Sequence, residues 1–126
     1  MKLFEQYKAT ADSLVLAKDW HGVIEYHTKA LEIKPDDHTC LLVRGGAYHA
    51  IGDHKKAYKD YDRLAEISKN SGAAYYDRAM VSFNLVNEGV TDEEYTRHTP
   101  CEDLLKAKEL GYPAEYDIFK VVCPDL

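Results

Sequence analysis

Glycine and proline are scarce in this sequence, with seven glycines and four prolines among 126 residues. Sustained alternation of β-branched and polar residues, which is typical of surface strands, is missing as well. Apolar residues recur instead at helical spacing along the chain. The sequence therefore predicts an all-α protein, and its length predicts one domain over residues 1–126.

Cysteine is also rare. The three residues, Cys40, Cys101 and Cys123, are widely spaced and form no CxxC pair. An odd number at such spacing does not make a disulfide framework. We expect the three side chains to be small buried hydrophobes in a reducing compartment.

Positive charge is not in excess, because the formal net charge is −6 and the isoelectric point is near 5.4. Nucleic-acid binders usually carry a basic stripe, and anionic membranes attract basic segments, so neither partner is expected. No apolar run reaches membrane-spanning length. Glu5, Lys8 and Asp12 interrupt any signal-peptide core near the N-terminus. These features predict a cytoplasmic protein.

Catalytic and metal-binding motifs are missing from the sequence. GxSxG, SxxK and phosphate-binding glycine loops do not occur, and Gly45-Gly46 lies within a helical stretch, where close packing explains it. The six histidines form neither HExxH nor a zinc-finger spacing. His98 and Cys101 suggest a thiol–imidazole pair, but an ordinary helix-start cysteine is the favoured interpretation. We predict no enzyme activity, no catalytic residue, no cofactor and no metal.

A period of 34 residues is the strongest pattern present. The stretch "DWHGVIEYHTKALEIKPDD" at 19–37 recurs in outline one period later, where Tyr61 follows His27 and Ile67 follows Ile33. The preceding segments also match, because "LLVRGGAYHAIG" at 41–52 aligns with "YYDRAMVSFNLV" at 75–86 and Arg44 with Arg78. Each period is long enough for two helices. The stretch at 19–37 is therefore the second half of a repeated helix pair.

These positions resemble the tetratricopeptide repeat, whose pattern runs W-x2-L-G-x2-Y and then A-x3-F, A and P. The second copy fits best, through Leu41, Arg44, Gly45, Tyr48, Gly52, Ala57 and Tyr61. The first fits through Tyr7, Ala11, Leu14, Val23, Ala30 and Pro35, and the third through Tyr75, Ala79, Leu85, Leu104 and Ala107. The resemblance implies a right-handed helical-repeat solenoid of three antiparallel helix pairs, with repeats at about 4–37, 38–71 and 72–112.

The third repeat departs from the pattern by about nine extra residues, an insert near 87–99. Thr91 and Glu94 suggest a capping box for a short helix there, and Thr99, Pro100 and Glu102 predict a second helix start. Gly111 and Pro113 should end that helix. A final capping helix is expected at about 114–122, with Tyr116, Ile118, Phe119 and Val122 covering the open end of the solenoid.

A binding surface follows from the resemblance, since the first helix of each repeat lines the concave face of such solenoids. Family positions that share one helical stripe give the candidate peptide-binding groove. Its residues are Lys8, Asp12, Val15 and Leu16, then Leu42, Val43, Gly46 and His49, and finally Tyr76, Asp77, Met80 and Phe83.

Some members of this family hold acidic chaperone tails in a carboxylate clamp of Lys, Asn and Arg side chains. The matching positions here are Lys8, Asp12, Val43, Ala73 and Asp77. Only the lysine is retained, and two carboxylates would repel the ligand. We therefore predict no such clamp.

The groove list is mostly apolar with acidic residues among the rest, which favours a protein or peptide partner that combines apolar anchors with basic residues. The predicted function is that of an interaction module, an adaptor or a small chaperone-like protein. The alternative is self-assembly, in which the groove or the open end is the seam of a homodimer. A third arrangement also stays open, in which the insert or the C-terminal segment fills the groove.

Overall fold

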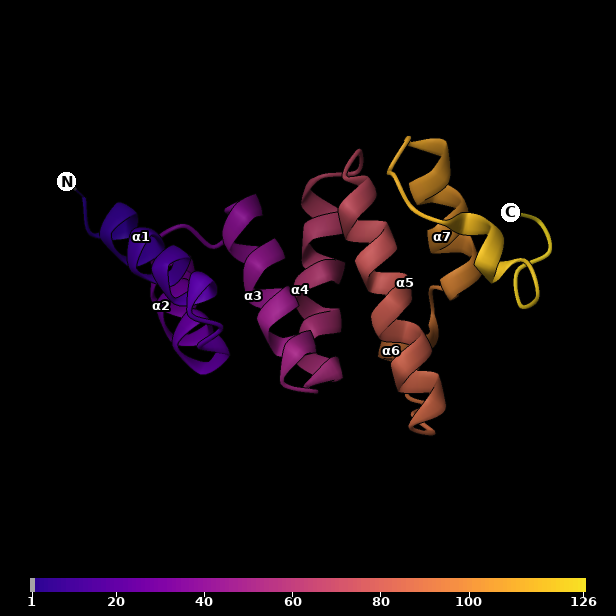
Figure 1. Ribbon diagram of the computed structural model, residues 1–126, viewed down its shortest axis with the longest axis horizontal. Coiled ribbons are helices and arrows are strands. Elements are labelled where there is room, and N and C mark those ends of the chain that lie inside the picture. The colour runs from indigo at the N-terminus through magenta and orange to yellow at the C-terminus, as the bar shows by residue number, and fades with distance from the viewer. Residues whose placement is uncertain (1) are drawn as a thin grey trace.

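The computed structural model describes residues 2–126 as a row of helices that runs from the N-terminus at one end to the C-terminus at the other (Figure 1). The elements are α1 (Leu3–Leu16), α2 (Trp20–Ile33), α3 (His38–Ala50), α4 (His54–Ile67), α5 (Gly72–Asn87), α6 (Glu93–Thr96), α7 (Pro100–Glu109) and the 3-10 helix η1 (Tyr116–Phe119). Each long helix packs on its neighbours in this order, except that α5 packs on α7 with α6 between them in the chain. This is the expected all-α solenoid of three antiparallel helix pairs.

Helix starts follow the 34-residue period. The side chains of Asp19 and Asp53, one period apart, accept hydrogen bonds from the backbone N–H groups of Gly22 and Lys56. The side chains of Asp37 and Ser71, also one period apart, cap α3 and α5 in the same way. Such caps satisfy N–H groups that lack a partner within the helix. The helix starts therefore repeat every 34 residues, as the core positions do.

A repeated arginine contact joins the helix pairs. The guanidinium of Arg44 donates two hydrogen bonds to Asp60, of 2.8 and 2.7 Å, and a third to Thr28. The guanidinium of Arg78, one period later, donates two to Asp103 of the same lengths and a third of 2.9 Å to Asp62. Thr28 and Asp62 are themselves one period apart. Each arginine therefore ties the first helix of its repeat to the second helix and to the preceding repeat.

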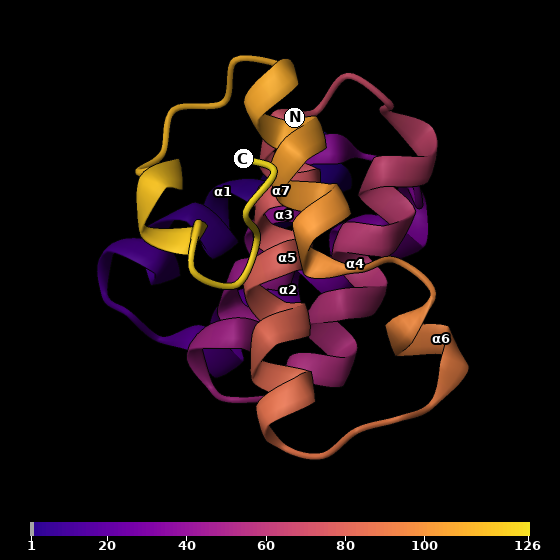
Figure 2. The same ribbon diagram turned by 90° about the vertical axis from the view of Figure 1, so that its right-hand side faces the viewer.

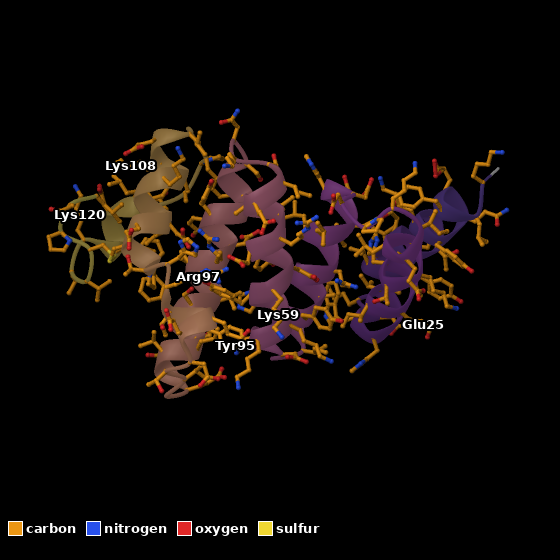
Figure 3. The ribbon with its side chains drawn as sticks, turned by 180° about the vertical axis from the view of Figure 1, so that it is seen from behind. Glu25, Lys59, Tyr95, Arg97, Lys108 and Lys120 are labelled. Carbon is orange, nitrogen blue, oxygen red and sulfur yellow. A yellow bond between two sulfur atoms is a disulfide. The ribbon has the colours of Figure 1, made fainter. Side chains whose placement is uncertain are left out.

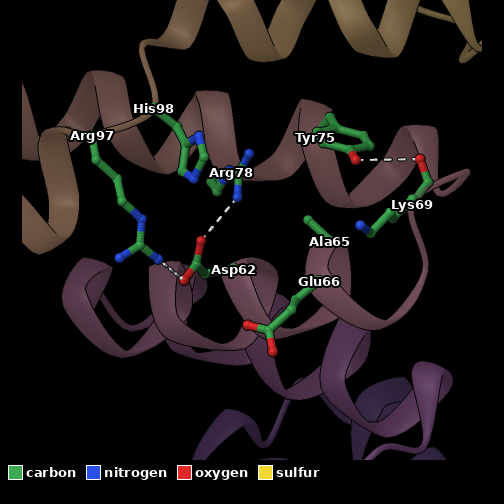
Figure 4. A pocket seen from close by; sticks show the side chains of 8 residues that line it. All are labelled: Asp62, Ala65, Glu66, Lys69, Tyr75, Arg78, Arg97 and His98. Atoms are coloured by element: carbon green, nitrogen blue, oxygen red, sulfur yellow. Dashed lines mark hydrogen bonds and ion pairs between the residues drawn. The ribbon is translucent and has the colours of Figure 1, made fainter.

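A cavity of about 300 Å³ lies beside Arg78 on the side of α4 and the insert, and Figure 4 shows its lining. Asp62 accepts hydrogen bonds from both Arg78 and Arg97 there. Both arginines that line the cavity are therefore held in ion pairs with Asp62. We therefore assign the arginines a structural role.

The insert contacts α4. Tyr95 of α6 is buried and packs edge-on against Tyr58, with ring centroids 5.5 Å apart; Figure 3 shows Tyr95 and Arg97 from behind. Our expectation that Thr91 caps this helix is wrong, because α6 begins at Glu93 after Asp92 and no side chain caps it. The buried tyrosine places this short helix instead. The capping box of Thr99 and Glu102, with Pro100 as the first helical residue, is confirmed.

The C-terminal segment differs from the expected helix at 114–122. It contains only the 3-10 helix Tyr116–Phe119, followed by turns. Tyr116 is buried, whereas Ile118 and Val122 are 69% and 61% exposed, so only part of the expected capping face packs. A nine-residue helix has little intrinsic stability in water. Side-chain contacts therefore decide the conformation of this segment.

The expectation that all three cysteines are unpaired is also wrong. Cys101 at the start of α7 forms a disulfide with Cys123, and their Cα atoms lie 5.4 Å apart. Cys40 is free and buried. Pairing of Cys101 also removes the thiol that a thiol–imidazole pair with His98 would need. The disulfide ties the end of the chain to α7.

His27 of α2 is fully buried, and neither ring nitrogen has a hydrogen-bond partner within residues 2–126. Burial lowers the pKa of this histidine, and the charges facing it are those of Asp12, Lys8, Asp37 and Arg44. The fold therefore favours the neutral ring. The stability that depends on this neutral form is complete above the ordinary pKa of 6.5 and is lost as the pH falls below it.

We expect His27→Phe to be increasingly more stable than the natural protein as the pH falls from 7.5 to 5.0, because Phe fills the site and does not titrate. Urea denaturation at several pH values measures this difference. His27→Gln is the control, since it removes the titration but keeps an unsatisfied polar group. A His27→Phe difference that is constant with pH would contradict the argument.

Candidate functional site

The twelve predicted groove residues lie on α1, α3 and α5, and each is at least partly exposed. Leu16 is the most open apolar member, at 88% exposure. Lys8 pairs with Asp37 at 3.8 Å, so the one lysine of the list already has a carboxylate partner. Asp12 is exposed. The first repeat thus presents little free positive charge on this stripe.

At the middle of the stripe, the two glycines of α3 make room for a side chain from α4. A Cβ atom on Gly45 would lie 2.7 Å from Cε1 of Tyr61, and one on Gly46 would lie 3.8 Å from the tyrosine hydroxyl. The close packing expected at these glycines is therefore contact with an aromatic ring. The Tyr61 hydroxyl lies beside Gly46, which is exposed.

Asp77 of α5 is the unusual charge of the site. Burial raises the pKa of its carboxyl group from 3.8 to about 6. No hydrogen bond or ion pair joins this carboxyl group to another of residues 2–126. Burial raises the pKa of both Tyr61 and Tyr112, and the charge of Asp77 raises it further. A carboxylate kept partly buried without a partner costs stability. Such groups are concentrated at functional sites.

Beyond Asp77, a hollow of about 560 Å³ opens between α3, α5 and the C-terminal segment. It is lined by His49, Met80, Phe83, Asn84, Asn87, Phe119 and Val122. Three of these residues belong to the predicted groove. The side-chain amide of Asn84 lies 3.1 Å from Nε2 of His49 and also donates to the carbonyl of Met80. Burial and the neighbouring His54 lower the pKa of His49, which favours its neutral ring.

The C-terminal segment covers the third-repeat end of the stripe. The ring of Phe119 stacks on that of Phe83 with centroids 5.9 Å apart, and it also meets Tyr76. Tyr76 further contacts Tyr112 and Tyr116, at centroid distances of 5.0 and 6.2 Å. In Figure 2 the C-terminal segment lies on one side of α5 and α7, and α6 lies on the other. Part of the predicted groove is therefore occupied by the chain itself.

Sequence reasoning missed several lining residues, because they come from other elements than the first helix of a repeat. Tyr61 belongs to α4, Tyr112 follows α7, and Phe119 and Val122 belong to the C-terminal segment. Phe119 was expected to cap the end of the solenoid but not to line a site. The paired glycines at 45 and 46 were the one sequence signal for a large neighbour.

Among residues 2–126, no group of three or more His, Cys, Asp or Glu side chains is placed to hold a metal ion. Within the same residues, no helix has both the length and the apolar character that crossing a membrane requires.

Comparison with known proteins finds relatives that share the repeat. The chain is 34% identical over 107 residues to "Small glutamine-rich tetratricopeptide repeat-containing protein 2" of Mycosarcoma maydis, a match that covers 81% of this chain and 30% of that protein. It is 24% identical over 98 residues to "Heat-shock protein cognate (HSC) co-chaperone sgt12" of Aspergillus fumigatus, covering 78% and 29%. The chain thus spans less than a third of the length of these relatives. No family model matches it.

A solved structure supports the architecture. The crystal structure of the Sgt2 TPR domain from Aspergillus fumigatus superposes with a TM-score of 0.74, covering 99% of this chain and 77% of that one. The two sequences are 20% identical. At this identity the likeness establishes the fold alone.

Proposed function

Because the chain is a tetratricopeptide repeat domain, we propose that it is a protein–protein interaction module that binds a peptide segment with apolar anchors and one basic side chain. The observation that carries the proposal is Asp77, a partly buried carboxyl group without a partner in the described chain. A lysine or arginine of a bound peptide would supply the missing charge and hydrogen bonds. The fold and the relatives support the general role of binding proteins.

The apolar side chains of the predicted groove would supply most of the area that a bound peptide buries. Leu42, Val43 and Met80 are partly exposed. Burying roughly 400 Å² of apolar surface gains about 10 kcal/mol before the costs of association are subtracted. Those costs consume much of the gain, so we expect dissociation constants in the micromolar range.

A second part of the proposal is that acidic tails are not ligands. Lys8 is paired with Asp37, and Asp12 and Asp77 stand where the clamp would need neutral or cationic groups. One relative carries the name of a heat-shock-cognate co-chaperone. We propose a similar adaptor or chaperone-like role here, with a partner segment of the opposite charge from an acidic tail.

Fluorescence anisotropy with matched synthetic peptides tests the proposal. The probes are a nine-residue peptide with two leucines, one phenylalanine and a central lysine, the same peptide with glutamate in place of lysine, and a peptide with an acidic C-terminus. We expect the lysine peptide to bind at least about tenfold more tightly than the glutamate peptide, which corresponds to about 1.4 kcal/mol. Added salt should weaken the lysine peptide most.

Asp77→Asn should remove the preference for lysine, while the control Asp12→Asn, at an exposed carboxyl group, should keep most of it. Tighter binding of the acidic peptide would refute the proposal. Light scattering across protein concentration runs in parallel. A concentration-dependent dimer that no longer forms in Leu16→Asp would favour the self-assembly alternative.

A further inference from the structure

The C-terminal segment, residues 113–126, covers apolar residues that belong to the predicted groove. Phe119 stacks on Phe83 and touches Tyr76, so the segment occupies the α5 surface in the way that a peptide ligand would. Its regular structure is limited to the four residues of η1. Ile118 and Val121 are 69% and 92% exposed, so besides Phe119 the segment packs mainly through Tyr116 and Cys123, which are buried.

The disulfide adds a covalent link between this segment and α7. Cys123 lies four residues after Phe119 and is joined to Cys101, the second residue of α7. The segment is thereby closed into a loop that runs from the end of α7 back to its start. A cross-link of this kind raises the effective concentration of Phe119 at the α5 surface.

A reductant has access to this bond. A hollow of about 220 Å³ lies beside both cysteines and is lined by Glu102, Leu105 and the last three residues of the chain. Cys101 is partly exposed, whereas Cys123 is buried at 3% exposure. An incoming thiolate would therefore reach the sulfur of Cys101 first. The N-terminal end of α7 would then stabilise the Cys101 thiolate when it is released.

We propose that the C-terminal segment is an internal ligand of the α5 surface, and that reduction of the Cys101–Cys123 disulfide by a dithiol reductant releases it and opens the groove. One thiolate of the reductant attacks Cys101, and Cys123 leaves and takes up a proton. The second thiol of the reductant then resolves the mixed disulfide and frees Cys101. Two electrons and two protons pass to the cysteines, and the reductant becomes a disulfide.

The occupant that replaces the segment is a peptide of similar chemistry, with an aromatic anchor against Phe83 and Tyr76. This part rests on the proposed function, because it assigns a regulation to the same site. The segment and a partner compete for one surface. The apparent dissociation constant therefore falls as the open fraction rises.

Hydrogen exchange on the Cys40→Ala protein tests directly whether the disulfide holds the C-terminal segment in place. In this variant only the two paired cysteines remain. We compare the oxidised protein, the protein reduced with dithiothreitol, and Cys101→Ser/Cys123→Ser with and without dithiothreitol. Reduction should raise exchange in 113–126, and a dye that binds exposed apolar surface should fluoresce more strongly. The double-serine protein should resemble the reduced form and should not respond to dithiothreitol. Unchanged exchange in 113–126 after complete reduction overturns the proposal.

Anisotropy with the lysine peptide is the second readout. Reduction should tighten binding by about tenfold if the oxidised form is open for about a tenth of the time. Phe119→Ala should tighten binding in the oxidised protein, where the disulfide is intact, which guards against misfolding of the double-serine variant. Equal affinity of the lysine peptide for all forms, with its preference over the glutamate peptide still lost in Asp77→Asn, overturns the regulation and leaves the proposed function standing. If the lysine peptide binds to none of the forms while exchange in 113–126 still rises on reduction, the proposed function is removed. The release of the C-terminal segment by reduction is then still supported.

Discussion

Arg78→Met should lower the free energy of unfolding by about 3–5 kcal/mol, the range seen when one partner of a buried ion pair is removed. The Arg78 side chain is only 5% exposed, and it donates two hydrogen bonds to Asp103 and one to Asp62. Asp103, whose side chain is 4% exposed, would be left buried without its counter-ion. Urea denaturation at pH 7, followed by circular dichroism, measures the loss.

Two control variants separate charge from packing. Arg78→Met/Asp103→Leu removes both charges and should recover much of the loss, because an apolar pair can replace a buried ion pair at little cost. Arg44→Met removes the equivalent arginine of the preceding repeat, whose side chain is 19% exposed, and should cost less. A loss below about 1 kcal/mol for Arg78→Met, within the range of ordinary substitutions, would contradict the assignment.

The repeated architecture was predictable because several independent signals share one period. Helix caps recur at 19 and 53 and at 37 and 71, and core positions recur with them. Local sequence specifies each cap, and packing of identical units specifies the stack. The match between Arg44 and Arg78 was visible in the sequence as well. The carboxylates that pair with these arginines were not identified, because only the packed helices bring them together.

The C-terminal segment was less predictable for the opposite reason. It lies outside the period, and no repeat fixes its partners. Its conformation depends on Phe119 and Tyr116 meeting α5 and on Cys123 reaching Cys101. Apart from the four residues of η1, residues 113–126 form no helix. An odd number of cysteines suggested no disulfide framework. Three cysteines are equally consistent with one disulfide, Cys101–Cys123, and one free buried thiol, Cys40.

The candidate site was predictable in part. Helical spacing and the family pattern gave the stripe on α1, α3 and α5, and its members are partly exposed as a binding surface requires. The tyrosines around Asp77 come from α4 and from the turn after α7, so no periodicity within one helix indicates them. The raised pKa of Asp77 is likewise a property of the assembled fold. The sequence showed only that position 77 is acidic; it did not show that the carboxyl group is partly buried.

Asp77→Asn should stabilise the protein at pH 7 by about 1–3 kcal/mol. Raising the pKa of this carboxyl group from 3.8 to about 6 corresponds to about 3 kcal/mol against its ionised form, and Asn removes the charge. The lower end of the range allows for the amide, which also lacks hydrogen-bond partners. Chemical denaturation at pH 7 measures the gain.

The pH dependence gives the sharper test. Between pH 3.8 and about 6 the folded protein binds more protons at Asp77 than the unfolded chain does, so this group makes stability fall as the pH rises. The advantage of Asp77→Asn should therefore be full above about pH 6 and should disappear below pH 3.8. Asp12→Asn, at an exposed position, should change stability by less than about 0.5 kcal/mol at pH 7.

A gain in stability combined with a loss of lysine-peptide selectivity would show why the carboxylate is kept. The residue costs the free protein stability and returns it when a cation is bound, which is the expected compromise at a functional site. Bound lysine peptide should then stabilise the natural protein more than it stabilises Asp77→Asn, as a larger shift in melting temperature at equal peptide concentration. A gain in stability with unchanged selectivity would instead mean that Asp77 lowers the stability of the fold without contributing to peptide binding. The lysine of the peptide would then have to bind elsewhere.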